Sequence, residues 1–199
     1  MKMKKIVFAM LSLLAYTVSY GQSAKNVLDK AAAVVSNPKG IQANFTMTGG
    51  MGDASGTISV KGRKFQATTP VATIWFNGKT MWTYMKKNDE VNVTTPNEAQ
   101  LQKINPYNFI NLYKSGYDMT MNKTGKDFVV HLTAQKSAKI KELFISVDKK
   151  SYHPTQVKML QGAKWTTFDI SNLKAQNLSD SMFTFNSKDF PTAEVIDLR

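Results

Sequence analysis

The chain opens with an apolar run that is shorter than a transmembrane helix. Residues 6–18 are almost entirely apolar, lysines precede them, and Ser19 and Gly21 place small residues just before a cleavage point. Such a run is too short to cross about 30 Å of hydrocarbon. The pattern therefore predicts a secretory signal peptide over residues 1–21 and one exported domain over residues 22–199.

The next apolar positions recur first at helical spacing and then at every second residue. Val27, Ala31 and Val34 lie on one stripe, which predicts an amphipathic helix over residues 23–36. Asn77-Gly78 between two apolar runs predicts a tight hairpin. Alternation of apolar and polar residues predicts strands at 41–47, 57–61, 64–69, 73–76, 80–85, 91–94, 117–122, 127–134, 140–148, 155–160 and 164–170.

A helical stretch interrupts the strands midway. Residues 95–103 and 105–114 have helical patterns, and the tail 183–185 has the alternation of a short strand. Helices do not alternate with strands, so a parallel sheet is not expected. The sequence predicts a mainly β (α+β) fold, in which one curled antiparallel sheet follows an N-terminal helix and carries a mid-chain helical insertion.

Large apolar residues lie on both faces of two neighbouring predicted strands and on more than one side of the second predicted helix of the insertion. A sheet with one face in water would alternate more strictly. Either these residues form ordinary core, or the insertion is a lid over an apolar trough that takes flexible chains. On the second interpretation, the candidate ligand-binding residues of the trough are Ile74, Trp75, Phe76, Met81, Trp82, Tyr84, Phe109, Ile110 and Tyr113.

Composition narrows the possible partners. The chain has no cysteine, so the exported domain must fold without disulfides. Its formal net charge is +12, from 26 Lys+Arg against 14 Asp+Glu. Only Arg63 and Arg199 are arginines, and the lysines form no dense block. Nucleic acid is therefore not an expected partner, and the lysines are interpreted as a solvated exterior.

Candidate catalytic or metal-binding groups are sparse. His131 and His153 have no partner at ligand spacing, so no metal site is expected. The glycine-rich segment 49–53 lacks the Lys-Ser/Thr of a phosphate-binding loop and is interpreted as a hairpin tip. Acidic residues form no pair suited to acid–base catalysis. We expect a protein that is not an enzyme and has no cofactor.

Several segments together resemble the LolA family, the periplasmic carriers of outer-membrane lipoproteins in Gram-negative bacteria. The most specific is Phe76-Asn77-Gly78-Lys79-Thr80-Met81-Trp82-Thr83-Tyr84. Ile41–Thr46 is similar to the family's opening strand, Val60–Arg63 to a later segment, and Phe183–Phe185 to its closing strand. The resemblance spans essentially the whole exported domain.

The resemblance implies an open half-barrel whose helical lid closes an apolar cavity for acyl chains. It also implies a monomer in the periplasm that takes a lipoprotein from an inner-membrane ABC transporter to an acceptor at the outer membrane. In the family, an arginine at the position of Arg63 hydrogen-bonds the lid and favours the closed state. Lys64 stands where the family usually has proline, and Ala67 where an aromatic residue is common.

Three other functions stay open at this point. A periplasmic binder of lipids or small hydrophobic molecules would need the same cavity without a protein cargo. A sensor of the same fold would read lipoproteins, usually with a second domain. An enzyme is the third alternative, although no catalytic constellation supports it.

Overall fold

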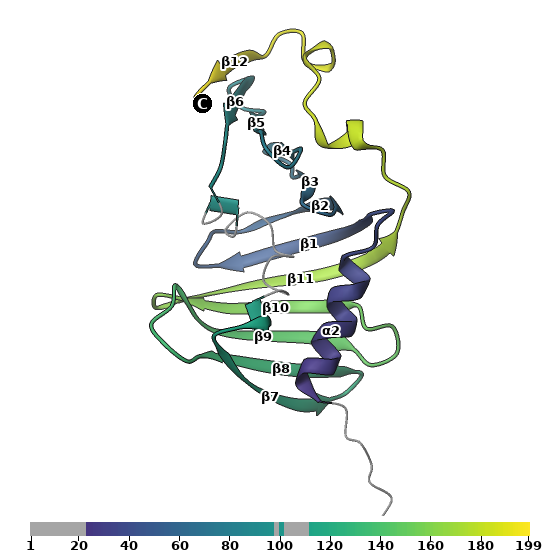
Figure 1. Cartoon of the computed structure of the whole chain (residues 1–199). Helices are drawn as coiled ribbons and strands as arrows, with labels where there is room; N and C mark the ends of the chain where they lie inside the picture. Colours follow the sequence, from purple (N-terminus) through teal and green to yellow (C-terminus); the bar gives the residue numbers. More distant parts are fainter. Residues whose placement is uncertain (1–22, 98–99, 102–111) are drawn as a thin grey trace, which may run out of the picture.

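One twelve-stranded sheet forms most of the molecule in the computed structural model, which describes residues 23–97, 100–101 and 112–199 (Figure 1). The strand order is β12-β6-β5-β4-β3-β2-β1-β11-β10-β9-β8-β7, and every neighbouring pair is antiparallel except β12 with β6. The strands are β1 (Ile41–Gly49), β2 (Ala54–Lys61), β3 (Lys64–Thr68), β4 (Ala72–Phe76), β5 (Met81–Met85), β6 (Glu90–Thr94), β7 (Tyr117–Thr124), β8 (Asp127–Ala134), β9 (Ile140–Asp148), β10 (Pro154–Gln161), β11 (Lys164–Ala175) and β12 (Glu194–Asp197). The sheet curls without closing, which confirms the predicted half-barrel.

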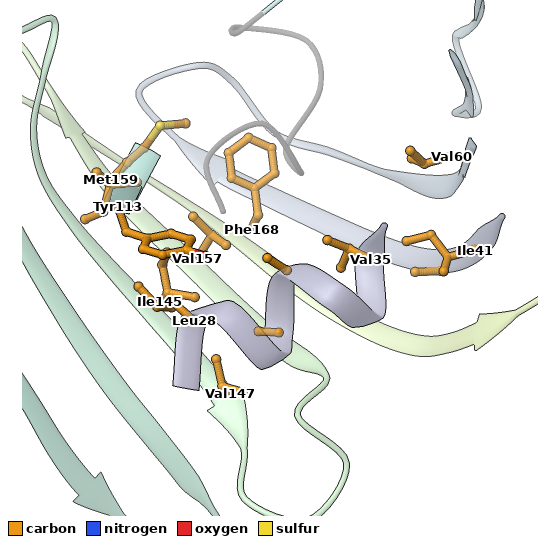
Figure 2. Close-up of a cluster of buried hydrophobic side chains, with 14 of the residues drawn as sticks. Leu28, Val35, Ile41, Val60, Tyr113, Ile145, Val147, Val157, Met159 and Phe168 are labelled. Carbon is orange, nitrogen blue, oxygen red and sulfur yellow. The ribbon is translucent and has the colours of Figure 1, made fainter. Parts of the chain in front are cut away.

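Helix α2 (Ala24–Val35) covers one face of the sheet, which we call the inner face. Ser23 caps its start, where the Ser23 hydroxyl accepts a hydrogen bond from the Asn26 amide at 3.1 Å. In the apolar stripe of α2, Val27, Leu28 and Ala31 are fully buried and Val34 is partly buried, and the helix packs on β7, β8 and β9. Figure 2 shows Leu28 and Val35 pointing toward side chains of the sheet. The helix predicted over residues 23–36 is confirmed.

Cross-strand pairing aligns the inner-face side chains into rows. Ile58 lies opposite Ala67, which lies opposite Ile74. The next row contains Val60, Phe65 and Phe76, and further rows continue through β1 and β8–β11. Because paired residues share a face, these rows and the stripe of α2 form one hydrophobic core.

The opposite face, which we call the outer face, is also covered at β3–β6. Trp75 pairs with Trp82, and Tyr84 pairs with Val91, so these residues share the outer face. The C-terminal segment, residues 176–199, runs along this half of the sheet and ends beside β6 (Figure 1). This cover explains why β4 and β5 are apolar on both faces.

Contacts along the C-terminal segment are both apolar and polar. The Trp75 ring lies 5.6 Å from Phe185 and 5.6 Å from Phe190, measured between ring centroids. Phe190 also lies 4.6 Å from the ring of Tyr84. At its start, Asp180 forms salt bridges with Lys61 at 3.1 Å and with Lys64 at 3.0 Å.

The predicted strand at 183–185 is wrong. Residues Asp180–Phe183 form a 3-10 helix, η3, and the last strand is β12 instead. The Ser179 hydroxyl accepts a hydrogen bond from the Ser181 amide at 3.3 Å, which starts the turn. Phe183 is then fully buried at the end of η3 rather than in a ladder. A second short 3-10 helix, η4 (Ser187–Asp189), follows.

The remaining predicted strands are confirmed, with small differences at their ends. At the predicted hairpin, the Asn77 side chain accepts hydrogen bonds from the amides of Lys79 and Thr80, and Gly78 has a φ of +100°. This is a conformation that glycine adopts without steric cost. Most of the predicted helical insertion lies outside the described residues. In its described part, residues 100–101 are helical and residues 112–114 form a 3-10 turn.

Candidate functional site

An apolar cavity of about 250 Å³ lies on the inner face, between the core and the ends of β1, β2, β3 and β4. One lining residue, Thr69, is polar. The lining residues are Phe45, Met47, Met51, Ala54, Ile58, Ala67, Thr69, Ala72, Ile74 and Phe168. Such a space can take apolar chains and offers almost no hydrogen bonds to a polar ligand.

Small residues at neighbouring inner-face positions leave this space unfilled. Ala54, Ala67 and Ala72 contribute only a methyl group each. Gly56 pairs with Phe45, and a Cβ at Gly56 would lie 1.9 Å from the Thr68 carbonyl oxygen. Glycine is therefore required there, and no side chain can project beside the Phe45 ring. Long side chains surround the gap, two of them flexible methionines.

The structure separates the residues that the sequence analysis grouped as a candidate site. Ile74 lines the cavity, and Phe76 and Met81 share its face. The Phe76 ring packs against Phe65, with ring centroids 5.5 Å apart, so it belongs to the core beside the cavity.

Trp75, Trp82 and Tyr84 lie on the outer face, on the other side of the sheet from the cavity. One cavity cannot hold both groups. The Tyr84 hydroxyl donates to Asp89 at 2.9 Å, and this hydrogen bond raises the pKa of Tyr84. Phe109 and Ile110 lie outside the described residues.

Tyr113 joins the end of the insertion to helix α2. Its side chain is 3% exposed, and its hydroxyl donates to Asp29 at 2.6 Å. Burial and then the bond to Asp29 raise the pKa of Tyr113. Hydrogen bonds from Lys25 and Tyr113 lower the pKa of Asp29. In Figure 2, Tyr113 lies between the helix and the side chains of β9 and β10.

Arg63 is exposed in the two-residue turn between β2 and β3. The helix that it is expected to hold lies outside the described residues, so the latch stays a prediction. Lys64, which follows it, is the first residue of β3 and pairs with Asp180. Ala67, the other departure from the family pattern, lines the cavity, where an aromatic ring would occupy part of the space.

Sequence reasoning missed most of the cavity lining. Phe45, Met47 and Phe168 were assigned to strands, but nothing in the alternation alone shows that they meet. Met47 pairs with Phe168 across β1 and β11 and with Ala54 across β1 and β2. Predicting the cavity lining requires this strand register, which a single sequence does not show.

The described residues offer little catalytic chemistry. No three His, Cys, Asp or Glu side chains among them are placed to hold a metal ion. His131 pairs with Glu142 at 3.0 Å and stacks on Phe144, with ring centroids 4.1 Å apart. None of the helices in the described part of the chain is long and apolar enough to cross a membrane.

The inner-face cavity and the curled sheet agree with the comparison of the chain with protein families. The profile of the family described as outer membrane lipoprotein carrier protein LolA matches residues 14–163. The chain belongs to the LolA family. LolA proteins are carriers, and lipoprotein binding is the function for which the family is named.

The chain is similar to solved structures at low sequence identity, and the first of those described below shows the same fold. An uncharacterized conserved protein from Thermus thermophilus is 13% identical, with a TM-score of 0.60, and the match covers 88% of this chain and 99% of that one. A LolA superfamily protein from Nitrosomonas europaea is 13% identical (TM-score 0.43, covering 82% and 98%). The Mycobacterium tuberculosis lipoprotein LppX is 8% identical (TM-score 0.46, covering 79% and 99%). No curated protein matches the chain.

Proposed function

We propose that this LolA-family protein carries lipoproteins through the periplasm, with an acyl chain of the cargo in the inner-face cavity. The observation that supports this most directly is the cavity itself, which is lined by aliphatic, aromatic and methionine side chains with a single threonine. Among the described residues of the predicted set, Ile74 lines it. Phe76 and Met81 support the cavity wall from the same face.

Acyl-chain burial provides the driving force. Each CH₂ group moved out of water contributes about 0.8 kcal/mol, so a lipoprotein anchor is costly to expose during transit. A cavity of this kind binds the chain without a covalent step. Transfer then exchanges one apolar site for another, and no catalytic residue is needed.

The proposed route starts at an inner-membrane ABC transporter and ends at an acceptor in the outer membrane, or at that membrane itself. Membership of the LolA family supports this route. Removal of residues 1–21 as a signal peptide would place the protein in the periplasm. The lid formed by the insertion, with Arg63 as its latch, belongs to the same proposal.

Mass spectrometry of the native protein from the periplasm tests the proposal against its main rival. A carrier is expected to copurify with a protein acylated at its N-terminus, in a complex that detergent dissociates. Copurification of free lipid alone would instead identify a lipid-binding or sensor protein of the same fold. A cavity-filled variant, Ala67→Phe, should lose the copurifying species in either case and so serves as the control.

A further inference from the structure

A second groove adjoins the apolar cavity between the β1–β2 hairpin and the turn that joins β3 to β4. Its volume is about 380 Å³. Met47, Ala54 and Thr69 line both spaces. Most of its exposed lining surface is apolar, but five of its nine lining residues carry a side-chain oxygen, against one in the cavity. Its lining residues are Thr46, Met47, Thr48, Asp53, Ala54, Ser55, Thr69, Pro70 and Val71.

An incompletely paired stretch of β2 forms one side of this groove. β2 pairs with β1 from Ala54 to Val60, but with β3 only from Thr57 to Lys61. Ser55 therefore has Thr46 as its partner on one side and, within the described chain, no strand partner on the other. A short stretch of open sheet edge thus lies beside the cavity.

The hairpin register shows which backbone groups face this edge. The turn between β2 and β3 has two residues, so the closing pair, Lys61 with Lys64, is a hydrogen-bonded pair. Alternate residues of an antiparallel strand direct their backbone groups to the same neighbour. Thr57 lies four residues before Lys61, so its N–H and C=O also point toward β3. Ser55 lies two residues before Thr57 and directs its N–H and C=O to the same side, where the groove lies.

We propose that this groove binds the polypeptide that follows the acylated residue of the cargo. This inference rests on the proposed function. The peptide lies extended along β2 and exchanges hydrogen bonds with the Ser55 backbone, as an added strand does. The hydroxyls of Thr46 and Thr48 lie close by as further acceptors for its N–H groups.

The charge in the groove favours a peptide over an anionic lipid head group. Asp53 is the one charged residue that the described part of the chain contributes to its lining, and its carboxylate accepts a hydrogen bond from the Gly49 amide at 3.1 Å. A carboxylate repels a phosphate and accepts from an amide. The cavity and the groove thus form a site with two parts, and an acylated peptide would contact both, whereas a free fatty acid would fill only the first.

Matched acylated peptides test this inference by calorimetry. One palmitoylated hexapeptide is compared with two versions of itself, each N-methylated at one of the two alternating sets of amides. One set should face β2 and the other should face away from it. We expect methylation of the first set to weaken binding about three- to tenfold for each N–H removed, and methylation of the second to have little effect.

Binding of free palmitate distinguishes a failure of the peptide groove from a failure of the proposed function. If all three peptides and palmitate bind equally, the acyl chain alone is recognised, so the groove is not a peptide site while the proposed function stands. If neither palmitate nor any acylated peptide binds, the proposed function fails.

Two variants of Ser55 locate the effect. Ser55→Pro removes the N–H that faces the groove, and Ser55→Ala removes only the hydroxyl. We expect Ser55→Pro to reduce the preference for the unmethylated peptide and Ser55→Ala to keep it. Palmitate binding by both variants shows that the cavity is intact. Full retention of the preference by a palmitate-binding Ser55→Pro would overturn the inference. If Ser55→Pro does not fold, the peptide comparison on the unmodified protein decides.

Discussion

Ile74 and Trp75 are consecutive residues of β4, and their side chains lie on opposite faces of the sheet. Ile74 lines the inner-face cavity, whereas Trp75 packs against Phe185 and Phe190 of the C-terminal segment. The two residues therefore have different roles. Ile74 belongs to the proposed acyl-chain site, and Trp75 holds the C-terminal segment against the outer face.

Substitutions at these two positions should have different consequences, one for stability and the other for ligand binding. Trp75→Leu removes a buried indole from an aromatic cluster, and we expect it to lower the free energy of unfolding by about 2–4 kcal/mol. Binding of an acylated peptide to the folded protein should not change. Ile74→Asn should instead weaken that binding at least tenfold, because it places an amide in an apolar lining. Chemical denaturation and calorimetry on both variants measure the two effects. The assignment fails if Trp75→Leu, still folded, loses acyl binding.

Filling the cavity should block the ligand without unfolding the protein. Ala67→Phe directs a ring into the space of about 250 Å³, so we expect acyl binding to fall at least tenfold and the melting temperature to change by only a few degrees. Ala175→Phe, at the exposed end of β11, makes the same chemical change away from the cavity and serves as the control. Equal affinity of both variants for a palmitoylated peptide would show that the ligand lies elsewhere.

The hydrogen bond between Tyr113 and Asp29 should make stability depend on pH at the alkaline end. The pKa of Tyr113 is raised in the folded state, so its contribution is present below the ordinary tyrosine pKa of about 10 and is lost as pH rises above it. Tyr113→Phe removes this proton. We expect the variant to be about 1 kcal/mol less stable at pH 7 and to lose less stability than the unmodified protein above pH 10. Urea denaturation at pH 7 and pH 10.5 measures both values. Parallel losses in the two proteins would contradict the prediction.

The same pair acts in the opposite direction at acid pH. The pKa of Asp29 is lowered, first by its hydrogen bond from Lys25 and then by that from Tyr113. Its contribution is therefore present above the ordinary aspartate pKa of about 3.9 and is lost as pH falls through the lowered value. An Asp29→Asn variant should show a shallower loss of stability between pH 5 and pH 2, which thermal unfolding across that range can measure.

The proposed lid latch predicts a defect in release. If Arg63 holds the lid closed in the empty carrier, reclosing helps to expel the cargo. Arg63→Leu should then accept a lipoprotein normally and pass it on poorly in a reconstituted transfer assay. Arg63→Lys keeps the charge but not the planar five-donor group, so we expect an intermediate defect. Transfer by Arg63→Leu at the normal rate would reduce Arg63 to a turn residue.

Much of the fold follows from the sequence because alternation is a local signal. The strand from Ile41 and the helix over residues 23–36 needed only periodicity, and Asn77-Gly78 was sufficient to predict the hairpin. The tail was different. Phe183-Thr184-Phe185 alternates as a strand does, yet Ser179 starts a 3-10 turn that places Phe183 in a buried position.

The sequence predicted that an apolar cavity exists, but not its position or its lining residues. Apolar residues on both faces of β4 and β5 indicated two covered faces, but not which face held a trough and which lay under the C-terminal segment. That distinction depends on register, which places Gly56 opposite Phe45 and Ala67 opposite Ile74. Small residues far apart in sequence create the gap, and a single sequence does not show that they meet.

Photo-crosslinking tests the central claim most directly. The probe is a palmitoylated peptide with a diazirine near the middle of its acyl chain, and peptide mass spectrometry identifies the labelled residues. We predict labelling of Phe45, Met47 and Ile74 on the inner face, and its loss in Ala67→Phe. Labelling of Trp75, Tyr84 or Phe190 on the outer face instead would contradict the account, because it would place the acyl chain under the C-terminal segment.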